Sequence, residues 1–140
     1  MKTVMFSYMT LGRIFCHTIT PDQLMDAIAA VGSGRGETSA NIYQLTEGYV
    51  ADVARLTGQS ITLAQATASS ELARCCIEAY WEHYGERYWM ITGRRAGAET
   101  LARIHHGGPD GWRKQETLHY WFKVKRKLVK SGKWKVKSEK

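Results

Sequence analysis

Helix-start signals recur at short intervals along this chain, and they restrict its fold more than any other feature. The first, Thr20-Pro21-Asp22-Gln23, combines an N-cap, a first-turn proline, an acid at the positive end of the helix dipole and a capping-box glutamine. Further signals follow at Thr46, at the capping box from Thr62 to Gln65, and at Ser70. No internal repeat or multi-strand pattern accompanies them, so we expect a mainly α-helical protein with room for one small hairpin.

Glycines predict where several of these helices end. The first helix should stop at Gly32-Ser33-Gly34, and the helix from Ser70 should stop at Gly85. A short helix over residues 99–106 should end at the turn 107–111, and a last helix should begin near residue 115 or 117. The glycine- and serine-rich stretch 32–41 predicts a loop or a truncated hairpin.

The positive charge of the chain is concentrated at one end. Residues 123–140 contain nine Lys and Arg against one acid, whereas residues 1–122 contain 11 bases and 12 acids, within a total net charge of +7. We expect this segment to be a solvated terminus, and the alternative is a contact with nucleic acid or an anionic cell envelope, in which Trp134 would stack on single-stranded bases. The candidate polyanion-binding residues are Lys125, Arg126, Lys127, Lys130, Lys133, Trp134, Lys135 and Lys137.

These patterns divide the 140 residues into three parts: an N-terminal arm or degenerate signal over 1–19, one domain over 20–128, and a basic tail over 129–140. No window approaches 18 consecutive apolar residues, so no membrane span is expected. Cys16, Cys75 and Cys76 are too few and too poorly placed for a disulfide framework, so we expect free thiols. Free thiols and the lack of a clear signal peptide favour a cytoplasmic or virion-delivered protein over a secreted one.

No motif in the chain predicts a metal or a cofactor. His105 and His106 are adjacent and should point in different directions from a helix, and no His-Glu-x-x-His or Cys-x-x-Cys pattern is present. The glycines at 32–36 are not followed by the Lys-Ser/Thr of a phosphate-binding loop. We therefore expect neither metal nor cofactor.

One segment is much more specific. Residues 102–111 read Ala-Arg-Ile-His-His-Gly-Gly-Pro-Asp-Gly and are followed by Tyr120-Trp121 and Val124, a pattern that resembles the invertebrate-type (destabilase) lysozymes and their phage and bacterial relatives. Upstream, Tyr43-Gln44 with Tyr49 and Asp52, and then Tyr80 with His83-Tyr84-Gly85, resemble that family in the same order. The resemblance covers roughly residues 21–128. It implies a lysozyme-like α+β fold, predominantly helical, here with a reduced hairpin region.

The resemblance also implies a cleft that binds the amino sugars of peptidoglycan. Its matched motifs place the candidate glycan-binding residues at Tyr43, Gln44, His105, His106, Gly107, Gly108, Tyr120 and Trp121. Residues 102–111 and Tyr43-Gln44 should then lie side by side across one cleft.

The departures from the family lie where its chemistry should be. The family ends its first helix in Val-Glu-Ser-Gly, and that Glu is the general acid, but this chain has Gly32 there. The loop from 35 to 41 is too short for the family hairpin and lacks its second carboxylate, an Asp. Since glycoside hydrolysis normally needs two carboxyl groups, Glu37 and then Glu47 are the candidate substitutes.

Three functions therefore remain open. The chain could be a lysozyme-like glycan-binding protein with lost or impaired muramidase activity, which we favour. It could be an active glycoside hydrolase with a displaced acid such as Glu37. It could also be a phage or mobile-element binding or inhibitor protein whose basic tail engages nucleic acid or an acidic protein.

Overall fold

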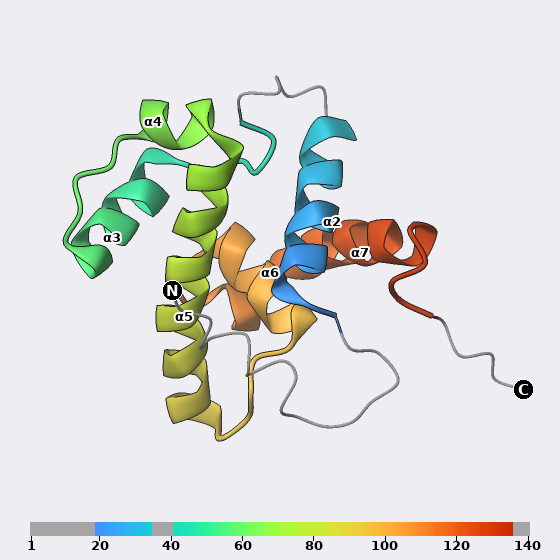
Figure 1. The fold of residues 1–140 in the computed structure, drawn as a ribbon. Coiled ribbons are helices and arrows are strands. Elements are labelled where there is room, and N and C mark those ends of the chain that lie inside the picture. Colours follow the sequence, from blue (N-terminus) through green and yellow to red (C-terminus); the bar gives the residue numbers. More distant parts are fainter. Residues whose placement is uncertain (1–18, 35–40, 136–140) are drawn as a thin grey trace, which may run out of the picture.

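The computed structural model describes residues 19–34 and 41–135, and this part of the chain is built from helices (Figure 1). They are α2 (Pro21–Gly34), α3 (Glu47–Thr57), α4 (Leu63–Ala68), α5 (Ser70–Thr92), α6 (Ala98–Gly107), the 3₁₀ helix η3 (Gly111–Arg113) and α7 (Thr117–Lys130). No strand occurs within these described ranges, which confirms the predominantly helical prediction. The reduced hairpin expected before Asn41 falls on residues 35–40, outside the described residues.

The predicted capping residues begin the helices. The Thr20 hydroxyl accepts from Gln23 N while Thr20 N donates to the Gln23 side chain, both at 3.1 Å. Thr46 caps α3, and Thr62 forms the predicted capping box with Gln65 at the start of α4. These caps satisfy backbone N–H groups that have no partner inside the first turn of a helix.

The predicted end of the long helix is wrong. α5 continues through Gly85, which is buried, and ends at Gly93 in the left-handed conformation with φ of 75°. A glycine inside a helix costs only about 1 kcal/mol relative to alanine. The buried side chains of Tyr84 and Tyr88, on either side of Gly85 in the sequence, supply packing that outweighs this cost. α2 continues to Gly34, so residues 32–34 are the last residues of this helix and not the start of the predicted loop.

The helix α6 lies at the centre of the molecule (Figure 1). It packs against α5, α7, α2 and η3, while α3 and α4 pack on α5, and α2 packs along α7. The core between these helices includes the fully buried Trp81 together with Leu24, Met25, Ile28, Ile77, Leu101, Ile104 and Leu128. This packing holds the C-terminal end of α6 next to the segment that leads into α3.

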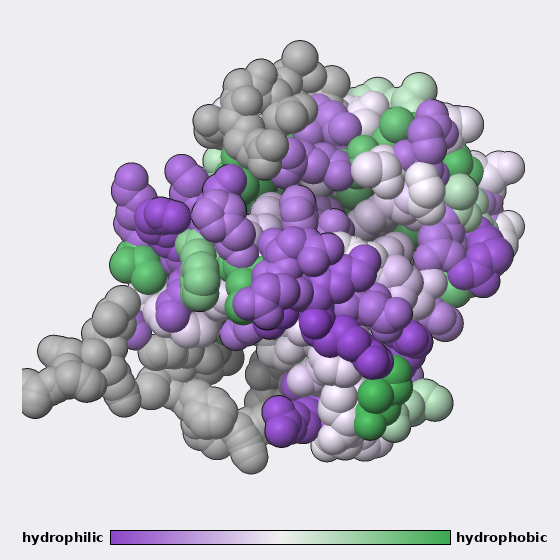
Figure 2. All heavy atoms as spheres, turned by 180° about the vertical axis from the view of Figure 1, so that it is seen from behind, coloured by the Kyte–Doolittle hydropathy of each residue, from purple (hydrophilic) through white to green (hydrophobic). Residues whose placement is uncertain are grey.

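Large hydrophobic side chains are exposed in two places, at Trp89, Met90 and Ile91 near the end of α5 and at Phe122 and Val129 on α7. Figure 2 shows hydrophobic spheres at that end of α5 within a mostly hydrophilic face. Among the helices that the structure describes, none is both long and apolar enough to cross a membrane. Cys75 and Cys76 are free thiols, and Cys16 lies outside the described residues.

The first residues of the basic tail belong to the folded part of the chain. α7 continues to Lys130, beyond the boundary expected after residue 128. After it, Trp134 is half-buried and packs edge-on against Trp121, with ring centroids 5.7 Å apart. Lys137 lies outside the described residues.

Candidate functional site

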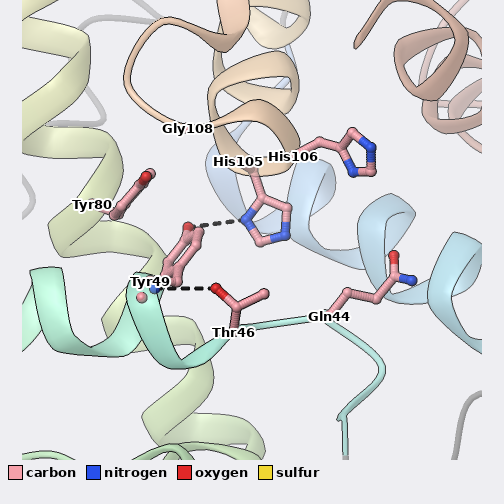
Figure 3. Close-up of a pocket in the computed structure, with 8 residues that line it drawn as sticks. Gln44, Thr46, Tyr49, Tyr80, His105, His106 and Gly108 are labelled. Atoms are coloured by element: carbon pink, nitrogen blue, oxygen red, sulfur yellow. Dashed lines mark hydrogen bonds between the residues drawn. The ribbon is translucent and has the colours of Figure 1, made fainter. Parts of the chain in front are cut away.

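The two segments predicted to meet do so at a pocket of about 210 Å³ (Figure 3). Gln44, Thr46, Gly48 and Tyr49 line it from α3 and the segment that leads into α3, and Tyr80, His105, His106 and Gly108 line it from α5 and the end of α6. The volume is below the roughly 300 Å³ at the lower end of small-molecule sites. The pocket can therefore hold one part of a larger ligand rather than the whole of it.

A tight turn over residues 41–45 places Gln44 in the wall of this pocket. The Asn41 side chain donates to the Leu45 carbonyl at 3.1 Å and accepts from Leu45 N at 2.9 Å, which closes the turn. Gln44 adopts a left-handed backbone with φ of 58°, which is uncommon for a residue other than glycine. Its side-chain oxygen is buried and accepts no hydrogen bond from a described residue. Strain and an unsatisfied acceptor thus coincide at the pocket wall.

His105 joins the two sides of the pocket from within the core. Its Nε2 lies 2.9 Å from the carbonyl oxygen of Tyr43, and its Nδ1 lies 2.9 Å from the Tyr49 hydroxyl. Burial lowers the pKa of His105 to about 4, so the ring is neutral at pH 7. A carbonyl can only accept, so Nε2 carries the proton and Tyr49 donates to Nδ1.

Tyrosine rings form the aromatic wall. Tyr49 and Tyr80 stack with centroids 3.9 Å apart and planes at 15°. Burial raises the pKa of both hydroxyls, so both stay protonated at neutral pH. Behind them, Tyr84 donates to Asp52 at 2.5 Å, and Asp52 also pairs with Arg55. Asp52 therefore has a structural role in this arrangement.

His106 points away from His105, as predicted, and is exposed at the pocket rim. Its ring stacks on Tyr120 with centroids 4.1 Å apart and planes at 6°. Gly108 follows with φ of 90°, a conformation that favours glycine. Stacking on Tyr120 thus fixes the orientation of the His106 ring at the rim of the pocket.

The structure brings four of the eight candidate glycan-binding residues to the pocket wall: Gln44, His105, His106 and Gly108. Tyr43 contributes its carbonyl to His105, whereas its hydroxyl accepts from Arg74 Nε at 2.9 Å. A Cβ atom on Gly107 would lie 2.5 Å from a methyl group of Thr117, so packing explains that glycine. Trp121 is buried against Trp134 rather than at the pocket.

Four pocket residues are not among the predicted glycan-binding residues: Thr46, Gly48, Tyr49 and Tyr80. Tyr49 and Tyr80 belong to the motifs that resemble the family, and this membership is the sequence signal that points to them. Thr46 carries only the signal of a helix cap, a role that it fills. A helix cap beside a pocket cannot be distinguished from an ordinary one without the fold.

Gly32 is buried against the main chain of Ile42. A Cβ atom on residue 32 would lie 1.8 Å from the Ile42 carbonyl oxygen and 2.7 Å from its carbonyl carbon. Real Cβ atoms do not approach this closely, so only glycine fits here without a shift of the backbone. The main chain of residue 42 occupies the direction in which an acidic side chain would extend.

No carboxylate is among the described residues that line the pocket. Glu47 is exposed at the start of α3 and does not line it, and Glu37 lies outside the described residues. Within the described ranges, no group of three or more His, Cys, Asp or Glu is placed to hold a metal ion. The pocket wall supplies an amide, hydroxyls, an imidazole and aromatic faces, which suit a neutral polar ring.

Comparison with known proteins gives relatives that are named lysozymes. The chain is 35% identical over 95 residues to invertebrate-type lysozyme 6 of Caenorhabditis elegans, covering 64% of this chain and 67% of that protein. It is 38% identical over 87 residues to a lysozyme of Magallana gigas, covering 61% of this chain and 58% of that protein. The chain thus spans about two thirds of the first relative's length and less of the second's. No family model matches the chain.

A chain in the crystal structure of Aeromonas hydrophila PliI in complex with Meretrix lusoria lysozyme has a similar fold. The TM-score is 0.58 at 27% sequence identity, and the match covers 74% of this chain and 86% of that chain. The helical architecture therefore defines a lysozyme-like protein. The sequence relatives make the assignment narrower: the chain belongs to the invertebrate-type lysozyme family.

Proposed function

We propose that this protein binds the glycan of peptidoglycan and has lost the muramidase activity of its relatives. The observation that carries the proposal is the contact between Gly32 and Ile42, because it leaves no room for a side chain where the family has its general acid. Removing a general acid costs roughly 10²- to 10⁴-fold in rate. Glycoside hydrolysis also needs a second carboxyl group, and the described pocket wall has no carboxylate.

Retention of binding is supported by the pocket itself. The stacked and largely buried rings of Tyr49 and Tyr80 give the pocket a rigid aromatic lining, against which the apolar edge of a sugar can rest. The buried Gln44 oxygen needs a donor, which a sugar hydroxyl or an N-acetyl N–H could supply. Neither feature takes part in proton transfer by a catalytic acid. Both can therefore be retained in a protein that binds glycan without cleaving it.

The test separates binding from cleavage on purified peptidoglycan. We expect the protein to sediment with the insoluble polymer while turbidity and reducing ends stay unchanged. His106→Ala removes the imidazole at the rim and should weaken binding at least fivefold. The matched control is His119→Ala, which removes an exposed histidine on α7 outside the pocket wall.

Two results would overturn this proposal. Equal binding by His106→Ala and His119→Ala would place the glycan elsewhere on the molecule. Clearing of the polymer by the unaltered protein would show that a displaced acid is active, and Glu37→Gln should then abolish the clearing.

A further inference from the structure

A second hollow lies between α2 and α7 and shares no lining residue with the first pocket. Its volume is about 330 Å³. The α2 side supplies Gln23, Asp26, Ala27 and Ala30, and the α7 side supplies Lys127, Lys130, Ser131 and Lys133. We call it the lysine groove.

The fold, rather than a loose tail, brings the third lysine to this groove. After α7 the chain turns at Gly132, which has φ of 80°. The backbone N–H groups of Lys133 and Trp134 then donate to the Leu128 carbonyl at 2.9 and 3.2 Å. Trp134 packs against Trp121, and Lys125 Nζ lies 5.2 Å from the centre of the Trp134 ring. Lys133 is thereby held beside Lys127 and Lys130.

The charges in the groove are unbalanced. Its one acid, Asp26, already pairs with Arg74. Residues 123–135 contain seven Lys and Arg and no Asp or Glu. Lysines in the last turn of a helix also stabilise its negative end, which accounts for Lys127 and Lys130. That effect does not account for Lys133, which lies beyond the helix and lines the same groove.

We propose that the lysine groove binds phosphodiester groups of an anionic cell-wall polymer. The ammonium groups of lysine bind phosphate as point charges, and three of them line one groove. The inference rests on the proposed function, since it gives the protein a second contact with the same wall. Among the described residues the groove has no aromatic side chain, and Trp134 is packed on Trp121. This arrangement favours a polymer without bases over single-stranded nucleic acid, which uses aromatic stacking platforms.

The experiment uses labelled poly(glycerol phosphate) that is free of peptidoglycan. The triple variant Lys127→Gln, Lys130→Gln and Lys133→Gln should bind it at least tenfold more weakly at physiological salt. The matched triple variant Lys123→Gln, Arg126→Gln and Lys135→Gln removes the same charge from the same segment but none from the groove lining. The affinity of this control variant for poly(glycerol phosphate) should fall less than threefold. Equal losses in the two variants would overturn the groove as a site.

A second arm of the experiment tests the nature of the ligand. A single-stranded oligonucleotide with the same number of phosphates should bind no more tightly than poly(glycerol phosphate). If the oligonucleotide binds more tightly than poly(glycerol phosphate), and the groove variant loses that binding, the groove is a nucleic-acid site and the proposal of a wall polymer is overturned. If the triple variant loses its helical circular dichroism, Lys130→Gln with Lys133→Gln replaces it, because both side chains are exposed.

The two proposals can fail separately. Peptidoglycan stripped of phosphate polymers tests the first pocket alone, and poly(glycerol phosphate) tests the lysine groove alone. Absence of binding to the phosphate polymer by the unaltered protein would overturn the second proposal and leave the first intact.

Discussion

His105 donates its Nε2 proton to the carbonyl oxygen of Tyr43 across 2.9 Å, which ties the end of α6 to the turn that precedes α3. Both residues come from the motifs that carry the family resemblance. The bond is buried and lies next to the pocket, so it fixes one wall relative to the other. In this chain these two matched residues therefore form a structural joint between the walls of the pocket.

The low pKa of His105 makes stability depend on pH. Between pH 6.5 and about 4 the unfolded chain takes up a proton at this ring that the folded protein excludes. The free energy of unfolding should therefore fall as pH decreases through this window, by up to roughly 3 kcal/mol in total. Urea unfolding at pH 7, 6 and 5 measures the slope. The variant His119→Asn, at an exposed histidine, should show the same dependence of the free energy of unfolding on pH. A free energy of unfolding that does not change with pH in the unaltered protein would contradict the prediction.

The hydroxyl of Tyr49 is predicted to contribute to stability through His105. Tyr49→Phe keeps the stacking on Tyr80 but leaves the buried Nδ1 of His105 without its donor. A buried acceptor without a partner costs about 1–3 kcal/mol, which denaturant unfolding would detect. Tyr88→Phe is the matched control on α5 and should cost less than about 1 kcal/mol. Similar losses in both variants would show that the Tyr49–His105 bond contributes nothing specific.

Restoring the family acid should not restore the activity. In Gly32→Glu the new Cβ meets the Ile42 carbonyl, so we expect no clearing of peptidoglycan and a loss of at least about 2 kcal/mol in stability. Gly32→Ala should show the same loss without adding a charge. At Gly48, in contrast, a Cβ meets nothing within 4 Å. Gly48→Ala should therefore be neutral or stabilise α3 by up to about 1 kcal/mol. Clearing by Gly32→Glu would contradict this account.

Removing the tail should affect folding as well as charge. Truncation after Leu128 deletes the last residues of α7 and the contact between Trp134 and Trp121. Trp134→Ala alone should lower the free energy of unfolding by about 1–3 kcal/mol, because the ring is half-buried. Trp89→Ala, at a ring that is 44% exposed, should cost less than about 1 kcal/mol. Melting curves of the three variants test this, and equal losses from the two tryptophan substitutions would contradict it.

The starts of the helices could be predicted because their signals are local. Thr46 and Thr62 cap helices through hydrogen bonds within three residues of their own positions. The end of α5 could not be predicted in this way, because Gly85 resembles a stop signal. The helix continues beyond Gly85 because its side chains pack in the core. The role of Trp134 was hidden for the same reason, since its partner Trp121 is on the preceding helix.

The candidate site was predictable in outline only. The family motifs indicated that Gln44 and His105 would meet, and they do. The motifs did not indicate that His105 would be buried and neutral or that Tyr43 would turn its hydroxyl toward Arg74. These properties depend on which side of each residue faces the core, and neither residue type nor spacing determines that.

The contact between Gly32 and Ile42 also bears on how such a chain can change over generations. A substitution that returned glutamate to position 32 would meet the Ile42 backbone before it could offer any benefit. Reversal would first require residues 41–45 to move away, although Asn41 holds that turn closed through two hydrogen bonds. A change at position 32 alone therefore cannot place a carboxylate there, because the turn over residues 41–45 must change together with it.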